Sequence, residues 1–355
     1  MFSRVGTLVN VKADQEYIQI GIRSHGKGIF HKDSVLGEEL GRKRVFWVVP
    51  NVFVVNIVFA WERAIAKTTE HERGLIASHR FPMYMPNTSK IDLDFAVYYF
   101  LTNRGVRLLK HASPGGAGRN KTLGQTEFSK AVLHIPSLST QKKIGALLTL
   151  IDRRIDLQRR KVELLKDYDR RILRSVFGGS KLPSCPLCSI VNVTMGQSPQ
   201  SNNYTFDEKE MLLIQGNADI IEGVIVPRIY TKQITKTCKR GDIIMSVRAP
   251  VGDVAVTDYD ACIGRGVCSI DGTVELYHYL RYCKEWNIWR KYSQGSTVDS
   301  VNREVINDLS IPANSVINSM MPEMLTMLQE LIIKDSKKLK RLEMFKMGLL
   351  QNLFV

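Results

Sequence analysis

An internal repeat constrains this chain more than any other feature of its sequence. The segment LLTLIDRRIDLQRRKVELLKDYDRRILRSVF covers residues 147–177, and MLTMLQELIIKDSKKLKRLEMFKMGLLQNLF covers residues 324–354. The two segments align without a gap at a shift of 177 residues, which is half the length of the 355-residue chain. Self-similarity at a fixed spacing indicates that one structural unit occurs twice.

Apolar residues in both segments recur with the spacing of a coiled coil. Two apolar positions in every seven residues form a seam along one face of a helix. We therefore predict two long spacer helices, within 138–178 and 313–355, whose seams pack together in an antiparallel pair. The alternative is two unrelated amphipathic helices that pack on separate cores. The predicted seam residues are Ile144, Leu148, Ile151, Ile155, Val162, Leu165, Ile172, Val176, Leu325, Leu328, Ile332, Leu339, Leu342, Leu349 and Leu353.

The repeat extends upstream of both helices. Three further pairs of segments match: AVYYFLTN at 96–103 with ELYHYLRY at 275–282, LHIPSLSTQ at 133–141 with LSIPANSVI at 309–317, and TLVNV at 7–11 with SIVNV at 189–193. We predict an α+β chain with two mixed domains, residues 1–137 and 179–312, each followed by one of the helices. The internal repeat implies a pseudo-twofold body.

Short β-branched runs and turn residues predict the local structure of the two domains. A helix is expected after Asp92 and another after Val274, and the apolar run Val45–Trp61 is expected to form two buried strands joined at Pro50-Asn51. Gly-rich loops are expected at 113–120 and 293–297, and a linker at 178–186. The expected strands are TLVNV, EYIQIGI, VFVVNIVF, GDIIMSV and GDVAVT.

Charge points to a polyanionic partner. The formal net charge is +15, and residues 1–177 carry +14 of it, with 30 Lys+Arg against 16 Asp+Glu. A basic surface is the electrostatic footprint of nucleic-acid binding, although charge also serves solubility. The predicted second domain, 178–312, has a net charge of about −1, so it offers few phosphate partners. We expect strong binding of a polyanionic partner to need a further subunit, or the basic helix at 142–177 to contact acidic protein surfaces instead.

Composition and cysteine usage favour a cytoplasmic protein. The N-terminus has no basic segment followed by an apolar core, so no secretion signal is expected. No apolar run approaches the roughly 20 unbroken residues of a membrane helix. All six cysteines lie in the second half of the chain, which does not fit a disulfide framework.

No catalytic, cofactor-binding or metal-binding motif is complete. GIRSHGKG at 21–28 resembles a phosphate loop but has Gly28 where magnesium binding needs a hydroxyl, so we read it as a basic surface loop. Cys185 and Cys188 form a lone CxxC without the second pair that a structural zinc site needs. Neither a methyltransferase tetrapeptide nor a nuclease pattern is present, which favours a non-catalytic chain.

Several segments together resemble one family. IPSLSTQKKIGALLTLIDRRIDLQRRKVELLKDYDRRILRSVF at 135–177 looks like the central region of type I restriction–modification specificity subunits. MGQSPQSNNY at 195–204 and IQGNADI at 214–220 resemble the opening of a target-recognition domain, and GDIIMSVRAPVGDVAV and IGRGVCSI also look like family segments. The second turn, IPANSVINSM, lacks the Leu and Gln of the first.

The resemblance implies a non-catalytic subunit that binds double-stranded DNA. Each recognition domain would read one half of a bipartite site, and the helices would set the spacing and dock two methyltransferase subunits. S-adenosylmethionine, ATP and Mg would be bound by partner subunits, including a restriction and motor subunit, and not by this chain. The alternative function is a single-chain DNA methyltransferase or nuclease with an unrecognised active site, and a third is a coiled-coil adaptor that does not bind DNA.

Side chains that read base edges and phosphates predict the DNA contacts. Arg, Lys, Asn and Gln read bases, whereas Lys, Arg and loop amides hold phosphates. The alternative for each residue is an exposed side chain that serves solubility. The candidates are Arg63, His79, Arg80, Arg119, Asn120 and Lys121 in the first domain, and Gln197, Ser198, Gln215, Asn217, Arg248 and Arg265 in the second.

Overall fold

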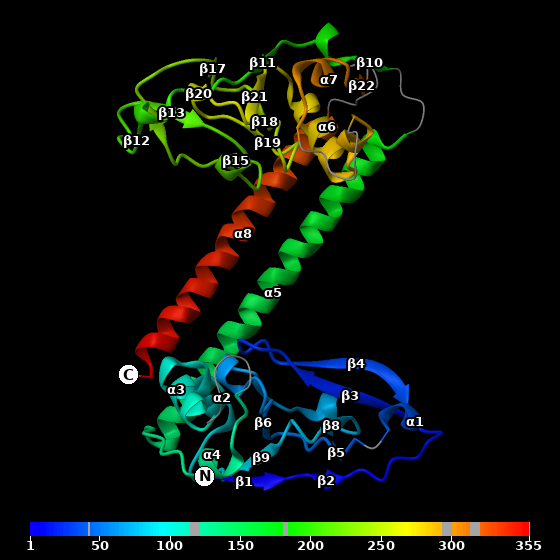
Figure 1. Ribbon diagram of the computed structural model, residues 1–355, viewed down its shortest axis with the longest axis vertical. Coiled ribbons are helices and arrows are strands. Elements are labelled where there is room, and N and C mark those ends of the chain that lie inside the picture. The colour runs from blue at the N-terminus through cyan, green and yellow to red at the C-terminus, as the bar shows by residue number, and fades with distance from the viewer. Residues whose placement is uncertain (42, 114–120, 180–183, 293–299, 313–319, 355) are drawn as a thin grey trace. The chain divides into compact units, whose positions relative to one another are not determined.

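The chain forms two compact units. The computed structural model describes residues 1–354 except 42, 114–120, 180–183, 293–299 and 313–319. Unit 1 comprises Met1–Gln158 and Leu339–Val355, and unit 2 comprises Arg159–Lys338. Each of the two long helices, α5 (Leu138–Phe177) and α8 (Met320–Asn352), therefore contributes one segment to each unit (Figure 1).

Two sheets form the body of unit 1. The four-stranded sheet is antiparallel throughout, and the five-stranded sheet contains one parallel pair, β8 with β3. In spatial order the first is β1 (Phe2–Val5), β9 (Met83–Pro86), β6 (Phe53–Val55) and β7 (Ile65–Lys67). The second is β2 (Thr7–Leu8), β5 (Val45–Trp47), β8 (Ile76–Ser78), β3 (Glu16–Ile22) and β4 (Ile29–Leu36).

Unit 2 contains a sheet pair of the same kinds. Its four-stranded sheet is antiparallel, and its five-stranded sheet has β13 parallel to β20. The first runs β11 (Val193–Met195), β21 (Val267–Ile270), β18 (Ile243–Ser246) and β19 (Val254–Val256). The second runs β12 (Tyr204–Thr205), β16 (Tyr230–Thr231), β13 (Met211–Ile214), β20 (Ala261–Ile263) and β17 (Thr237–Cys238).

The strand topology of unit 1 is repeated in unit 2. The equivalent strands, in chain order, are β1 and β11, β3 and β13, β4 and β16, β5 and β17, β6 and β18, β7 and β19, β8 and β20, and β9 and β21. Every pairing among these strands recurs with the same direction, including the single parallel pair. The predicted duplication is therefore present in the fold itself.

One predicted match within the repeat is wrong. TLVNV at 7–11 was matched with SIVNV at 189–193, but TLVNV follows β1 whereas SIVNV runs into β11, the strand equivalent to β1. Only Thr7–Leu8 of TLVNV is a strand. The two segments share a β-branched composition without sharing a place in the sheet.

The α-helices follow the last strand of each sheet pair, except for one short helix between β4 and β5. Unit 1 contains α1 (Gly37–Leu40), α2 (Leu93–Leu101), α3 (Asn103–His111) and α4 (Gln125–Ser129), and unit 2 contains α6 (Val274–Glu285) and α7 (Arg303–Asn307). The predicted start after Asp92 is correct, because the Asp92 side chain accepts a hydrogen bond from the Phe95 N–H at 2.9 Å and caps α2. The other helix begins at Val274 itself, one residue earlier than predicted.

Strand pairs outside the two sheets complete unit 2. Ile220–Ile221 (β14) and Val224–Ile225 (β15) form a hairpin, and Ser184–Pro186 (β10) pairs with Ser310–Pro312 (β22). The predicted linker at 178–186 is therefore partly wrong, because its last three residues form β10. The predicted Gly-rich loops at 113–120 and 293–297 fall almost entirely outside the described residues.

The segments of α5 and α8 pack antiparallel within each unit. In unit 1, Leu148 packs in one cluster with Phe354, and four residues further along α5 Asp152 pairs with Lys346 at 2.5 Å. In unit 2, Lys161 pairs with Asp335 at 2.7 Å, and Leu173 packs against Leu325. As the residue number on α5 rises, the residue number of its partner on α8 falls. This is the order expected for the predicted antiparallel pair.

Seam positions are buried or half-buried along both helices. Ile144, Leu148, Ile155, Val162, Leu325 and Ile332 are buried, and the other predicted seam residues are half-buried. Polar residues also occupy the heptad, because Gln158 and Asp169 on α5 and Asp335 on α8 are buried at seam spacing. Buried polar groups in a coiled-coil seam fix the register of the pair.

Candidate nucleic-acid interface

Three loops of unit 1 meet at one end of the four-stranded sheet. The Ile57 N–H donates to the Arg80 carbonyl at 3.0 Å, which joins the β6–β7 loop to the β8–β9 loop. The Leu123 N–H donates to the Ile57 carbonyl at 2.8 Å, which adds the segment ahead of α4. We call residues 56–64, 79–82 and 121–124 the loop edge of unit 1 (Figure 1).

Four of the predicted DNA-binding residues lie on the loop edge of unit 1. His79 and Arg80 are exposed in the β8–β9 loop, Lys121 is half-exposed, and Arg63 ends the short helix η1 (Ala60–Glu62) with a positive φ of 63°. The Arg63 guanidinium donates to the Asn103 side chain at 3.5 Å. A guanidinium has five N–H donors, so others remain for another acceptor. The candidates Arg119 and Asn120 lie outside the described residues.

The β3–β4 turn adds exposed cations to this edge. The His25 N–H donates to the Glu62 carbonyl at 2.8 Å, and the Gly26 N–H donates to the Arg63 carbonyl at 2.9 Å. Arg23, His25 and Lys27 are exposed on this turn. A strand, β4, follows the GIRSHGKG motif where a phosphate loop needs a helix, so the motif is the turn of a hairpin.

Two arginines near His79 were missed by sequence reasoning. Arg4 and Arg44 line a shallow pocket of about 300 Å³ together with His79, and the His79 N–H donates to the Arg44 carbonyl at 3.1 Å. The three residues lie far apart in the sequence and come together through β1, β5 and the β8–β9 loop. Only the pairing of strands could have revealed this basic pocket.

Unit 2 has an equivalent loop edge. The Val247 N–H donates to the Gly266 carbonyl at 2.9 Å, and the Val301 N–H donates to the Val247 carbonyl at 2.9 Å. These bonds join the β18–β19 loop, the β20–β21 loop and the segment ahead of α7, just as in unit 1. We call residues 247–253, 264–266 and 300–301 the loop edge of unit 2.

Four predicted residues of unit 2 gather around the β20–β21 loop. The Arg265 N–H donates to Ser198 Oγ at 3.1 Å, and the Gln197 N–H donates to the Ile263 carbonyl at 2.9 Å. A Cβ at Gly266 would lie 2.2 Å from the Gln215 carbonyl oxygen, so the glycine permits this close backbone approach. The Arg265 side chain is exposed.

The remaining two candidates of unit 2 lie on neighbouring turns. Arg248 is exposed in the β18–β19 loop and forms an isolated bridge with Ser300. Asn217 begins the short helix η5 (Asn217–Asp219), and the Asp219 carboxylate accepts from the Gln215 N–H at 2.7 Å. The structure thus brings Gln197, Ser198, Gln215 and Arg265 together, with Asn217 in the adjoining turn and Arg248 in the adjoining loop.

Arginines occupy equivalent loops in the two units. Arg80 and Arg265 lie in the loops that enter β9 and β21, and Arg63 and Arg248 lie in the loops that leave β6 and β18. Arginine offers a fixed fork of donors that matches guanine edges and phosphate oxygens. Each unit therefore presents the same pair of arginine-bearing loops at the same end of its four-stranded sheet.

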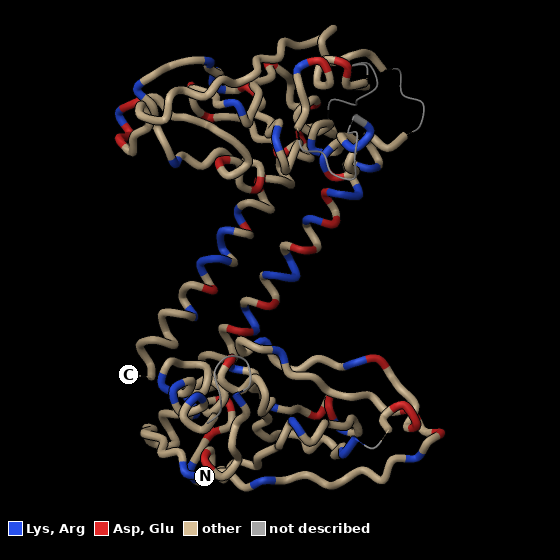
Figure 2. Tube along the Cα trace, in the orientation of Figure 1, with Lys and Arg blue, Asp and Glu red and all other residues tan. Residues whose placement is uncertain are grey.

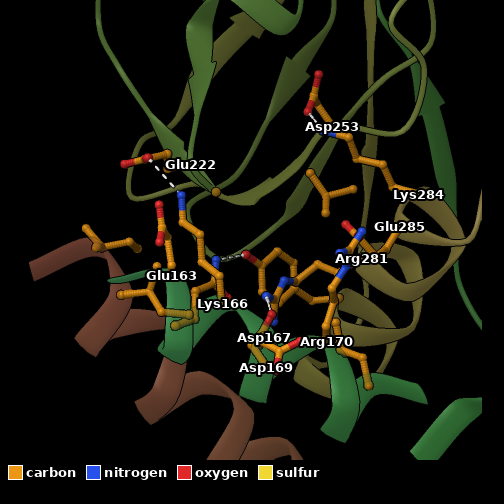
Figure 3. Close-up of a pocket in the computed structure, with 17 residues that line it drawn as sticks. Glu163, Lys166, Asp167, Asp169, Arg170, Glu222, Asp253, Arg281, Lys284 and Glu285 are labelled. Carbon is orange, nitrogen blue, oxygen red and sulfur yellow. Dashed lines mark hydrogen bonds and ion pairs between the residues drawn. The ribbon is translucent and has the colours of Figure 1, made fainter. Parts of the chain in front are cut away.

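A hollow of about 640 Å³ in unit 2 is lined by ion-paired residues of α5, α6 and the sheet loops (Figure 3). Arg281 on α6 pairs with Asp169 on α5 at 2.5 Å, and Lys166 lies 3.6 Å from Glu222. Burial raises the pKa of the Asp169 carboxyl, and the Arg281 charge opposes that rise. The pairs join the α5 segment of unit 2 to the rest of this unit.

His278 lies beside this network and is fully buried. Its Nε2 lies 2.9 Å from Thr326 Oγ1 on α8, and its Nδ1 lies 3.0 Å from the Arg281 guanidinium. Burial, together with the neighbouring Arg281 charge, lowers the pKa of His278 to about 3. A neutral imidazole at this depth serves packing between α6 and α8.

Residues 51–167 match the family model of the type I restriction modification DNA specificity domain. The predicted resemblance to type I specificity subunits is confirmed. A protein provisionally named type I restriction enzyme MjaX specificity subunit, from Methanocaldococcus jannaschii, is 26% identical over 224 residues, or 56% of this chain. The match covers 52% of that protein, so the chain spans about half the length of this curated relative.

Solved structures share the fold. The S subunit of a type I restriction–modification system from M. genitalium has a TM-score of 0.67 at 13% identity, covering 100% of this chain and 94% of that one. A chain from work on complex assembly and conformational transition of the type I R-M system has a TM-score of 0.53 at 20% identity, covering 96% and 92%. The two-domain α+β architecture of type I specificity subunits is therefore that of this chain.

Two further properties concern the described residues only. Within them, no helix is long and apolar enough to cross a membrane. His, Cys, Asp and Glu side chains do not gather there in any group of three that could hold a metal ion. Cys185 lies in β10 and Cys188 is exposed, and both are free thiols.

Proposed function

We propose that this chain is a DNA sequence-specificity subunit of a type I restriction–modification system. Each unit reads one half of a bipartite double-stranded DNA site through its loop edge. The observation that carries the proposal is the equivalence of Arg80 with Arg265 and of Arg63 with Arg248 on loops joined by the same backbone hydrogen bonds. Two equivalent DNA-reading units in one chain can each bind one of two half-sites held at a fixed spacing.

Selection of bound sequences from random DNA tests this proposal. The wild-type chain, with its methyltransferase subunits present, is expected to enrich two fixed half-sites separated by an unread gap. Arg80→Ala should relax preference within one half-site and Arg265→Ala within the other, each costing about 1–3 kcal/mol of discrimination. Arg240→Ala is the matched control, because Arg240 is exposed at the opposite end of β18. Enrichment of no sequence would contradict the proposal and favour an adaptor.

Methyltransferase subunits dock on the helices in this proposal. Exposed apolar side chains recur on α5 at Leu147, Leu150 and Tyr168, and on α8 at Met324, Met327 and Phe345. Each α8 residue lies 177 positions after its α5 counterpart. Two matched apolar patches, Leu147 with Leu150 in unit 1 and Met324 with Met327 in unit 2, support two copies of one partner.

Native mass spectrometry of the assembled complex tests the docking sites. Leu150 is 61% exposed and Met327 is 70% exposed, so serine at either position should leave the fold intact. Leu150→Ser and Met327→Ser should each remove one methyltransferase subunit, and the double variant should remove both. Lys142→Ser, an exposed change on another face of α5, should leave two subunits bound. An unchanged stoichiometry in the double variant would exclude these patches.

Catalysis is assigned to partner subunits. In this proposal methyltransferase subunits bind S-adenosylmethionine, and a restriction and motor subunit binds ATP and Mg. Support comes from the absence of a recognised catalytic motif in the sequence. Incubation of the purified chain with DNA and labelled S-adenosylmethionine should give no methyl transfer until methyltransferase subunits are added. Transfer by this chain alone would favour the single-chain enzyme instead.

A further inference from the structure

A basic pocket of unit 1 adjoins the loop that carries Arg80. It has a volume of about 300 Å³, and its polar lining comes from Arg4 of β1, Arg44 directly before β5, and the neighbours Ser78 and His79. Within the described part of the chain, no carboxylate lines this pocket. The pocket is therefore surrounded by side chains that donate hydrogen bonds, without a negative charge of its own.

The two arginines of this pocket are suited to an anion. Both Arg4 and Arg44 are exposed, and neither guanidinium has an ion-pair or hydrogen-bond partner among the described residues. Two like charges beside one pocket repel each other, and an anion bound between them replaces that repulsion with attraction. The planar fork of arginine matches phosphate oxygens, and charge-assisted hydrogen bonds to phosphate are stronger than those between neutral groups.

Two hydrogen bonds connect the pocket to Arg80. The Arg80 N–H donates to Ser78 Oγ at 3.3 Å, so the hydroxyl proton of Ser78 can be donated to another acceptor. The His79 N–H donates to the Arg44 carbonyl at 3.1 Å, which fixes the β8–β9 loop to the segment that enters β5. A group held by Ser78 and His79 thus lies beside Arg80, the residue proposed to read bases.

Unit 2 carries fewer cations at the equivalent places. Its strand β11, the equivalent of β1, has no Lys or Arg in Val193–Met195. The residue directly before the loop arginine is Gly264, where unit 1 has a histidine. Lys236, directly before β17, is the one cation there that matches Arg44. The full set of cations is therefore a feature of unit 1.

We propose that this pocket binds one backbone phosphate of the DNA half-site that unit 1 reads, an inference that rests on the function proposed above. Arg4 and Arg44 pair with the phosphate oxygens, and Ser78 and His79 donate hydrogen bonds to them. Phosphate contacts fix the register of a protein on DNA, whereas base contacts specify the sequence. Arg4 and Arg44 are thus positioning residues that place a base pair in front of Arg80, and unit 2 holds its half-site without this anchor.

A scan with uncharged phosphate analogues tests this proposal. The DNA is the sequence selected by the wild-type complex, with each phosphate replaced in turn by a methylphosphonate. The half-site of unit 1 is the one in which Arg80→Ala relaxes preference. At one phosphate in or beside it, the replacement should weaken wild-type binding about tenfold, because it removes charge-assisted hydrogen bonds.

Removal of the two arginines should abolish this sensitivity. Arg4→Gln combined with Arg44→Gln should bind the unmodified site about tenfold more weakly, and the same methylphosphonate should then cost less than about twofold. The slope of log K against log salt should fall by about 0.9, the value for one phosphate. Arg44→Gln alone, at a position outside the strands, repeats the test if the double variant melts at a lower temperature than wild type.

A control of equal charge separates the pocket from the general field of unit 1. Lys32→Gln combined with Lys43→Gln removes two positive charges from exposed positions that do not line the pocket. This control should keep the tenfold effect of the methylphosphonate. The proposal is overturned if no phosphate at the unit 1 half-site matters, or if the arginine variants stay as sensitive as wild type, and the proposed function stands in both cases. Enrichment of no sequence would overturn the proposed function and this inference with it.

Discussion

His278 gives unit 2 a defined response to acid. Its pKa falls from 6.5 to about 3 in the folded chain because the imidazole is buried beside Arg281. The unfolded chain therefore takes up the proton first, so this contribution to stability is present above pH 6.5 and is lost as the pH falls toward 3. The loss is about 1.4 kcal/mol per pH unit within that window, or about 2 kcal/mol at pH 5.

The measurement compares wild type with His278→Gln by urea denaturation at pH 7 and pH 5. The variant should lose about 2 kcal/mol less than wild type between these pH values, since glutamine does not titrate. Asp169 acts in the opposite direction because its pKa is raised, and it is present in both proteins. His79→Gln, an exposed change in unit 1, should behave like wild type. Equal losses in wild type and His278→Gln would contradict the assignment.

Arg23 and Lys27 should contribute to affinity without contributing to sequence preference. Both are exposed on the β3–β4 turn, next to the loop edge of unit 1. If each neutralises one phosphate, replacing both with alanine should reduce the slope of log K against log salt by about 1.8. Titration of the selected DNA at several salt concentrations measures this slope. Lys90→Ala, exposed beyond the far end of β9, should leave the slope unchanged. A changed sequence preference would mean that these residues read bases.

Residue types were predictable from the sequence, but their grouping was not. Arg80 and Arg265 were candidates because arginine reads base edges, and both are exposed on equivalent loops. Arg4 and Arg44 were missed because only the sheet brings them to His79. A backbone hydrogen bond from the Ile57 N–H to the Arg80 carbonyl joins the β6–β7 and β8–β9 loops. Such a bond cannot be predicted from the types of the two side chains.

At the scale of elements, the helix seam can be tested with two leucines that lie two positions apart on α5. Leu148 is fully buried and Leu150 is 61% exposed, and both lie in the unit 1 segment of α5. Leu148→Ala should lower the free energy of unfolding by about 2–5 kcal/mol, because it removes buried methyl groups and leaves a cavity. Leu150→Ala should change it by less than about 0.5 kcal/mol. Urea denaturation measures both, and similar losses would show that Leu148 is not a core position.

Helices and strands were predicted best where the spacing of apolar residues alone determines the element. EYIQIGI forms all of β3, and the heptad pattern places α5 and α8 correctly. VFVVNIVF ends as a strand at Val55, because the Asn56 side chain accepts from the Val58 N–H at 3.1 Å and turns the chain. Helix α3 was missed because its start is set by Thr102, which caps Gly105 at 3.2 Å directly after α2 ends.

At the scale of the whole molecule, the proposed role of the helices as a spacer predicts a change in the DNA gap. Seven residues inserted after Gln158 and seven after Lys338, where the two units meet along each helix, keep the heptad in step. One heptad adds about 10 Å of helix. The unread gap should lengthen by about three base pairs at roughly 3.4 Å each.

Selection of bound sequences with the doubly lengthened protein makes that measurement. The two half-sites should stay unchanged while the gap grows. Insertion into α5 alone is the control, because it leaves α8 short and should abolish selection of a fixed gap. A lengthened protein that retains the original gap would show that helix length does not set the spacing.

The sharing of α8 between the units affects how the chain folds as it is made. Residues 339–355 belong to unit 1, and Phe354 stacks on Phe95 of α2 with ring centroids 5.2 Å apart. The ribosome therefore synthesises every residue of unit 2 before it synthesises residues 339–355, the last segment of unit 1. Synthesis proceeds at about 5–20 residues per second, so unit 1 waits about ten seconds or more between the emergence of α2 and that of Phe354. The half of the molecule that is made first is finished last, and during that interval its aromatic cluster is open to chaperones.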